Sequence, residues 1–124
     1  MAAPNLVNVA TITAKSDTAL LTGTSATAVV SNAASSGKVF KINSLVISNV
    51  DASAAATITV GIYPQDDIAG TAVVYANAVS VAPNSFLVVI DKNTGMYLEE
   101  DTSLGVTASA ANDLTYTVTY EELS

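Results

Sequence analysis

The stretch that decides the fold runs from Ser103 to Leu123 and reads SLGVTASAANDLTYTVTYEEL. Its larger apolar residues fall on every second position, before and after a turn at Asn112-Asp113; they are Leu104, Val106, Ala108, Leu114, Tyr116, Val118 and Tyr120. A period of two is typical of β-strands with one buried face. We interpret the stretch as a C-terminal β-hairpin whose outer face carries threonine and serine with almost no charge.

The same alternation, or a short β-prone run, predicts the remaining strands. They are expected at residues 6–13, 18–22, 27–31, 38–50, 56–63, 72–81, 86–90 and 96–99. A change of phase at Asn43-Ser44 predicts a β-bulge. The continuous apolar run 86–90 predicts a strand covered on both faces, and the turn after it predicts a hairpin return at 96–99. No window has helical periodicity, so we expect an all-β, antiparallel, jelly-roll-like β-sandwich of about eight to ten short strands.

A chain of 124 residues is long enough for one domain with one core. We expect that domain at residues 18–124, and residues 1–17 are read either as a docking arm or as an ordinary first strand. The apolar phase of each strand predicts the core residues, which are Phe40, Ile42, Ile58, Val60, Leu87, Val89, Val106, Tyr116 and Val118.

The charge content is low for a soluble domain. Charged residues are 12% of the chain, about half the usual share, and the net charge is −7. Such a chain lacks the basic face that binds phosphates, so we expect no nucleic-acid partner and no anionic membrane partner. Few charges also predict that much of the surface faces other proteins.

The residue inventory excludes most catalytic chemistry. The chain has no histidine and no cysteine, so a Ser-His-Asp triad, a zinc site of histidines and thiolates, and a disulfide are impossible. The acidic clusters Asp66-Asp67 and Glu99-Glu100-Asp101 could supply oxygen ligands for calcium. Their spacing is not that of a calcium loop, and we read them as solvated turn acids. We therefore expect no enzyme, no cofactor and no metal.

Two further expectations concern the termini and the tyrosines. The start, Met1-Ala-Ala-Pro4, lacks a basic region followed by an apolar core, which predicts a soluble protein without a secretory signal. Tyr63 is out of the apolar phase of its strand and is expected to be the exposed ring, a feature that would suit a carbohydrate-binding module. Tyr116 and Tyr120 are expected in the core.

Several motifs in this order resemble small virion proteins of tailed bacteriophages. The motifs are GKVFKINSLVISN at 37–49, AATITV at 55–60, VAPNSFLVV at 81–89, LEEDTSLGVTAS at 98–109 and YEEL at 120–123. The chain departs from the pattern at Glu100-Asp101-Thr102-Ser103, where the family often has Gly-Asp-Ser, and this alters a turn. The resemblance covers residues 18–123 and implies a β-sandwich without catalytic residues.

The resemblance implies a structural part of the virion that decorates the capsid or forms a fibre, neck or tail accessory part. We expect it on the capsid surface and expect it to be made in the host cytoplasm. We expect a capsid decoration, or cement, protein that binds the major capsid protein or another virion protein. Alternatives are a neck, tail or fibre accessory protein and, in another class, a carbohydrate-binding module. A homo-oligomer is expected, with a trimer as the specific form. The candidate interface residues are Leu6, Val7, Val9, Thr57, Thr59, Tyr63, Thr115, Thr117 and Thr119.

Overall fold

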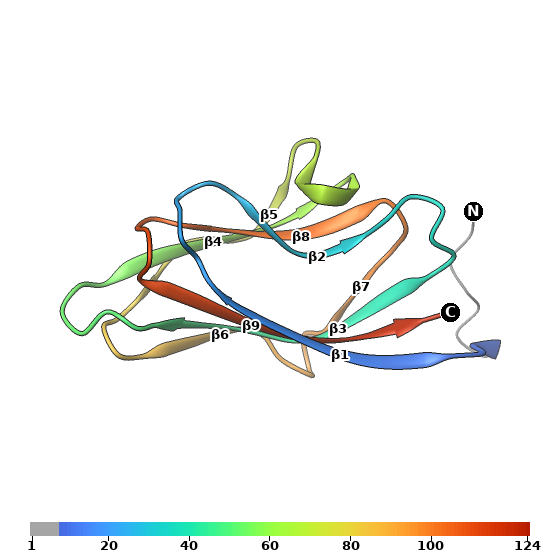
Figure 1. Cartoon of the computed structure of the whole chain (residues 1–124), viewed down its shortest axis with the longest axis horizontal. Coiled ribbons are helices and arrows are strands. Elements are labelled where there is room, and N and C mark those ends of the chain that lie inside the picture. The colour runs from blue at the N-terminus through green and yellow to red at the C-terminus, as the bar shows by residue number, and fades with distance from the viewer. Residues whose placement is uncertain (1–7) are drawn as a thin grey trace.

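The computed structural model describes residues 8–124, which form two antiparallel β-sheets packed face to face (Figure 1). The elements are β1 (Ile12–Leu20), β2 (Thr27–Asn32), β3 (Val39–Asn49), β4 (Ala56–Tyr63), the 3-10 turn η2 (Asp66–Ile68), β5 (Val73–Val81), β6 (Phe86–Ile90), β7 (Met96–Leu98), β8 (Thr102–Ala108) and β9 (Leu114–Leu123). Sheet A has the order β1-β9-β3-β6, with β7 also paired to β3, and sheet B has the order β2-β8-β4-β5. The predicted all-β sandwich is confirmed.

Most connections carry the chain from one sheet to the other. Strands β1, β3, β6 and β9 belong to sheet A, whereas β2, β4, β5 and β8 belong to sheet B. Only β4 and β5 follow each other as neighbours within one sheet. This alternation is the jelly-roll arrangement, in which most strand partners are distant in sequence.

The predicted C-terminal hairpin is wrong. Strand β8 pairs with β2 and β4 in sheet B, and β9 pairs with β1 and β3 in sheet A. The turn at Asn112-Asp113 carries the chain from sheet B to sheet A, and backbone hydrogen bonds hold it against other segments. Asn112 N donates to Leu21 O, and Val50 N donates to Asp113 O, both over 2.8 Å. Period-two alternation shows that a strand has one buried face, but it does not identify the neighbouring strand.

The predicted hairpin of β6 and β7 is also wrong. Both strands pair with β3, one after the other, and residues 91–95 loop out between them. The predicted bulge at Asn43-Ser44 is confirmed, and it lies in β3 between the two pairings. Strands β6 and β7 therefore form one interrupted edge strand. Phe86 (67%) and Val88 (48%) lie on the outward side of sheet A and are exposed, not covered as expected.

The core lies between the sheets and contains most of the predicted residues. Leu87 and Val89 are only partly buried, because they lie on the edge strand, and the other seven predicted residues are buried. Asn32 is fully buried, and its Nδ2 donates to Lys38 O and Leu98 O, each over 3.0 Å. Asn49 Nδ2 donates in the same way to Ala54 O and Val81 O. Each amide thus bonds one buried carbonyl at the end of a strand, Leu98 O or Val81 O, which would otherwise lack a partner, and one part-buried carbonyl in a loop.

Strand β1 runs without a break through residue 17, the position at which an arm was expected to end. It pairs with β9 along its whole length, and all nine of its side chains are exposed. Val9, which precedes it, is half-buried. The candidate interface residues Leu6 and Val7 lie outside the described residues.

Candidate functional site

The outward side of sheet A is an uncharged surface that crosses four strands, and we call it the outer A face. It consists of Ser16, Thr18, Leu20, Ser44, Val46, Ser48, Phe86, Val88, Thr115, Thr117 and Thr119. The strand register places these side chains in rows. One row joins Thr18, Thr117, Val46 and Val88, which are successive partners across β1, β9, β3 and β6.

The rows combine hydroxyl and apolar groups. Ser16 Oγ lies 3.4 Å from Thr119 Oγ1, and Thr18 Oγ1 lies 3.4 Å from Thr117 Oγ1. Toward the two edges of the sheet, Leu20 (42% exposed) and Phe86 (67% exposed) add apolar area. Short hydroxyl side chains beside apolar ones allow another protein to approach closely without removing charges from water.

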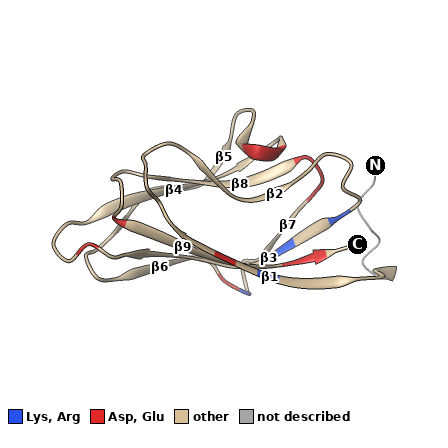
Figure 2. Ribbon diagram, viewed as in Figure 1, with Lys and Arg blue, Asp and Glu red and all other residues tan. Residues whose placement is uncertain are grey.

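Charged residues gather at one end of sheet A, near the C-terminus (Figure 2). Lys41 and Glu121 form the row that follows the outer A face, and Asn43 Nδ2 donates to Glu121 Oε1 over 2.9 Å. An open hollow of about 540 Å³ lies there, lined by Lys41, Asn43, Ser44, Lys92, Thr119 and Glu121. The outer A face therefore has a polar border on one side.

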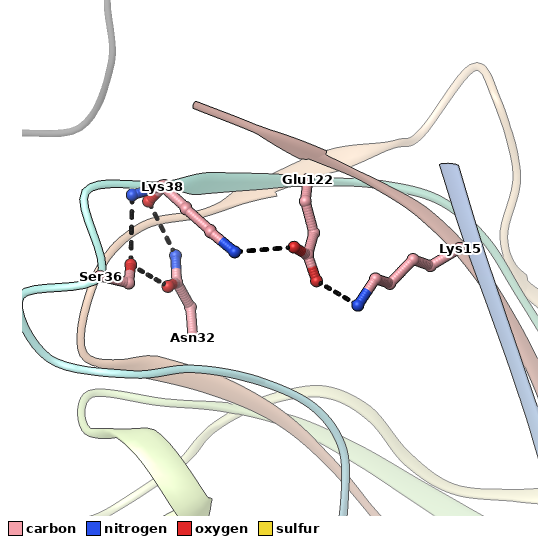
Figure 3. Close-up of polar contacts among 5 residues, drawn as sticks. All are labelled: Lys15, Asn32, Ser36, Lys38 and Glu122. Carbon is pink, nitrogen blue, oxygen red and sulfur yellow. Dashed lines mark hydrogen bonds and ion pairs between the residues drawn. The ribbon is translucent and has the colours of Figure 1, made fainter. Parts of the chain in front are cut away.

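An ion cluster on the other side of the sheet ties three strands together. Glu122 of β9 lies 3.0 Å from both Lys15 Nζ of β1 and Lys38 Nζ, just before β3, as Figure 3 shows. Burial raises the pKa of Glu122, but the hydrogen bonds from both lysines outweigh burial and hold that pKa below its ordinary value. The hydrogen bond to Glu122 raises the pKa of Lys15.

The outward side of sheet B differs, because the segment 64–72 folds over it. Ser103 Oγ donates to Gln65 O and accepts from Ile68 N, each over 2.8 Å. Under this segment, Gly105 of β8 lies so close to the Tyr63 ring that a Cβ there would be 2.7 Å from Cε1. The expectation that Tyr63 is the exposed ring is wrong; Tyr75 (42%) and Tyr97 (51%) are the exposed ones.

The structure divides the predicted interface residues between two opposite faces. Thr115, Thr117 and Thr119 lie on the outer A face, whereas Thr57 and Thr59 lie on the outward side of sheet B. Thr59 Oγ1 is already used within sheet B, since it accepts from Ala78 N over 3.0 Å. Sequence reasoning missed Phe86 and Val88, because an uninterrupted apolar run does not reveal that one side of its strand is exposed.

The two acidic segments lie near each other. Asp66 N donates to Asp101 Oδ1 over 3.2 Å, which brings η2 beside the turn before β8. Asp67 Oδ1 accepts from Ser31 Oγ over 3.1 Å. Within residues 8–124, no group of three or more acidic, histidine or cysteine side chains is placed to hold a metal ion.

Comparison with known proteins bears on the fold. No family model matches the chain, and no curated protein matches it. One solved structure of similar fold comes from work describing Bacillus endospore appendages as a family of disulfide-linked pili. It has 14% sequence identity and a TM-score of 0.53, over 92% of this chain and 88% of that one. The likeness supports the β-sandwich fold. In the described part of the chain, no helix has the length and apolar character needed to span a membrane.

Proposed function

We propose that this protein is a structural subunit that binds a larger protein assembly through the outer A face. In its specific form the proposal is a decoration protein on the capsid of a tailed bacteriophage. The observation that carries it is the uncharged outer A face, where Thr117, Phe86 and Val88 are exposed. The ordered motifs described above support the virion setting.

The mechanism would be burial of surface. Apolar area contributes about 25 cal/mol per Å² when it leaves water, and small hydroxyl side chains cost little to desolvate when they find partners. A weak contact of this kind stabilises a shell because it is repeated over many sites. The chain has no cysteine, so it cannot form disulfide links like those of the pili named above.

Copy number in purified virions tests the setting. A decoration protein should be present in hundreds of copies, whereas the same-class alternative, a neck, tail or fibre accessory protein, should be present in a few or a dozen. Absence from virions would reject both forms.

A pair of lysine variants tests the face. Thr117→Lys puts a charge in the middle of the outer A face and should abolish binding to the assembly. Thr107→Lys puts the same charge on the outward side of sheet B and is the matched control. If both variants bind like the parent chain, the outer A face is not the contact.

A carbohydrate-binding module is the candidate from another class, favoured only by the exposed rings of Tyr75 and Tyr97. Glycan binding that is lost in Tyr75→Ala or Tyr97→Ala would favour it over the structural role. The expected trimer is tested by the mass of the protein in solution.

A further inference from the structure

Strand β1 differs from the other edge strands of the sandwich. The edge formed by β6 and β7 is interrupted by residues 91–95, β2 has a register shift between Ala28 and Val30, and β5 is bent at Ala78, where φ is 48°. Strand β1 keeps one register with β9 from Ile12 to Leu20, with no bulge and no proline. Among residues 8–124, no strand pairs with its other side. A long, regular and open edge is a template for another strand.

The free backbone groups of this edge can be assigned. Thr11 and Ser124 exchange both N–H···O bonds, and Leu21 N donates to Leu114 O, so the odd-numbered residues bond to β9. The even-numbered residues alternate with them and direct their N–H and C=O groups away from β9. Ile12, Ala14, Ser16 and Leu20 therefore offer both backbone groups to an added strand, and Thr18 offers its C=O, because its N–H donates to Asp17 Oδ1 over 3.0 Å.

The sequence of β1, ITAKSDTAL, is complementary to itself when it is read antiparallel about Ser16. In that register Lys15 lies opposite Asp17 of the second copy, and Asp17 lies opposite its Lys15. Ile12 (61% exposed) lies opposite Leu20 (42% exposed) at both ends. Opposite charges and paired apolar groups stabilise cross-strand pairs, and like charges destabilise them.

We infer that β1 pairs antiparallel with β1 of a second copy about a two-fold axis at Ser16, which joins the two A sheets into one continuous sheet. The even-numbered residues would form hydrogen-bonded pairs across the axis. Lys15 and Asp17 would occupy the intervening non-hydrogen-bonded positions, where opposing side chains are closest. The contact is isologous, as in most homodimers.

The present contacts of the two charged residues are compatible with this pairing. Lys15 is exposed and forms one ion pair, with Glu122. Glu122 also pairs with Lys38 and would retain that partner if Lys15 turned toward the second copy. Asp17 Oδ2 accepts from Tyr116 Oη over 3.1 Å, and Asp17 Oδ1 accepts from Thr18 N, a local bond that the pairing of Thr18 with Ala14 of the second copy would replace. An ammonium group has three donors and a carboxylate accepts several bonds, so both can add a partner across the axis.

The inference goes beyond the proposed function and does not depend on it, because purified protein in solution tests it. Sedimentation should show monomer and dimer in equilibrium. We expect a dissociation constant of up to about 1 mM, a weak affinity that fits a small interface. A monomer at every concentration, or a mass of three copies, would overturn the inference. Neither result would change the copy number in virions.

Single cysteines test the register, because the chain has none of its own. Ser16→Cys should form a disulfide-linked dimer on mild oxidation, since directly opposed Cα atoms lie about 5.5 Å apart, within disulfide range. Thr18→Cys is the matched control. Its two copies would be separated by about 13 Å along the strands and should stay unlinked. Equal linking of both variants, or of Thr18→Cys alone, would overturn the register.

Charge exchange tests the recognition. Lys15→Asp and Asp17→Lys each place like charges opposite each other and should weaken dimerisation about tenfold or more. The double variant exchanges the two charges, keeps the net charge and should restore the dimer. Circular dichroism identifies any variant that fails to fold, and Ser16→Cys linking then decides independently. Single variants that dimerise like the parent chain would overturn the assigned charge pairs.

Discussion

The Tyr63 ring of β4 lies directly against Gly105 of β8, where a Cβ would be 2.7 Å from Tyr63 Cε1 and 2.9 Å from Ile68 Cγ2. The glycine thus allows the segment 64–72 to lie flat on sheet B. Ile68 has a φ of 56°, a backbone conformation that is rare for a β-branched residue. The hydrogen bond from its N–H to Ser103 Oγ helps to hold it there.

We therefore expect Gly105→Ala to lower the free energy of unfolding by about 1–3 kcal/mol, since ring and loop must move together. Gly23→Ala is the control, because a Cβ at that position meets nothing within 4 Å. Chemical denaturation of both variants measures the difference. Equal free energies of unfolding for the two variants would show that the segment 64–72 can move aside without loss of stability.

The buried amide of Asn32 provides a second prediction. Asn32→Ala leaves the buried Leu98 O and the part-buried Lys38 O without their donor, and an orphaned buried acceptor costs about 1–3 kcal/mol. Asn93→Ala, in the exposed turn after β6, should change the free energy of unfolding by less than about 0.5 kcal/mol. Thermal or urea unfolding compares them, and similar losses would contradict the assigned role of Asn32.

Acid stability should depend on Glu122. Its pKa is lower in the folded chain than its ordinary value of 4.5, so the unfolded chain binds a proton first as the pH falls. The stabilisation is present above that value and is lost as the pH falls through the folded pKa. Glu122→Gln should be less stable at neutral pH and show a shallower acid-induced loss. Parallel stability curves for both chains between neutral and acidic pH would refute this.

Substitutions at buried and at exposed strand positions should differ in their effect on the free energy of unfolding. Ile58 is fully buried, and Ile58→Ala should cost about 2–5 kcal/mol of folding free energy. Val88 is 48% exposed on the outer A face, and Val88→Ala should cost far less while weakening binding to an assembly. Urea unfolding measures the first effect, and a pull-down with the assembly measures the second. The reverse order of costs would contradict the burial pattern.

The sequence predicts burial better than it predicts neighbours, for a physical reason. Leu104 and Leu114 are buried as expected, because alternation records which side of a strand meets the core. Their strands nevertheless lie in different sheets, because the turn binds Leu21 and Val50, which are distant in sequence. Tyr63 has the outward phase, but a loop covers it. Such coverage depends on tertiary contacts that no local pattern contains.

The same limit applies to the candidate site. Thr117 was identifiable from the outward phase of a threonine-rich strand, and the register confirms that it lies on the outer A face. Thr57 has the same local signature and lies on the opposite side of the molecule. The phase of a strand shows that a side chain points outward, but only the pairing of strands shows which outward residues share a surface.

The position of β9 also constrains when this protein can fold during synthesis. Strand β9 lies between β1 and β3 in the interior of sheet A, although it is translated after every other strand. Until Leu123 has been made, β1 and β3 lack the partner that joins them, and the inward side chains of β3 remain in water. Sheet A therefore forms late, from strands far apart in the chain, a topology associated with slow folding. During that delay, the unpaired strands are the part of the nascent chain most in need of protection from premature association.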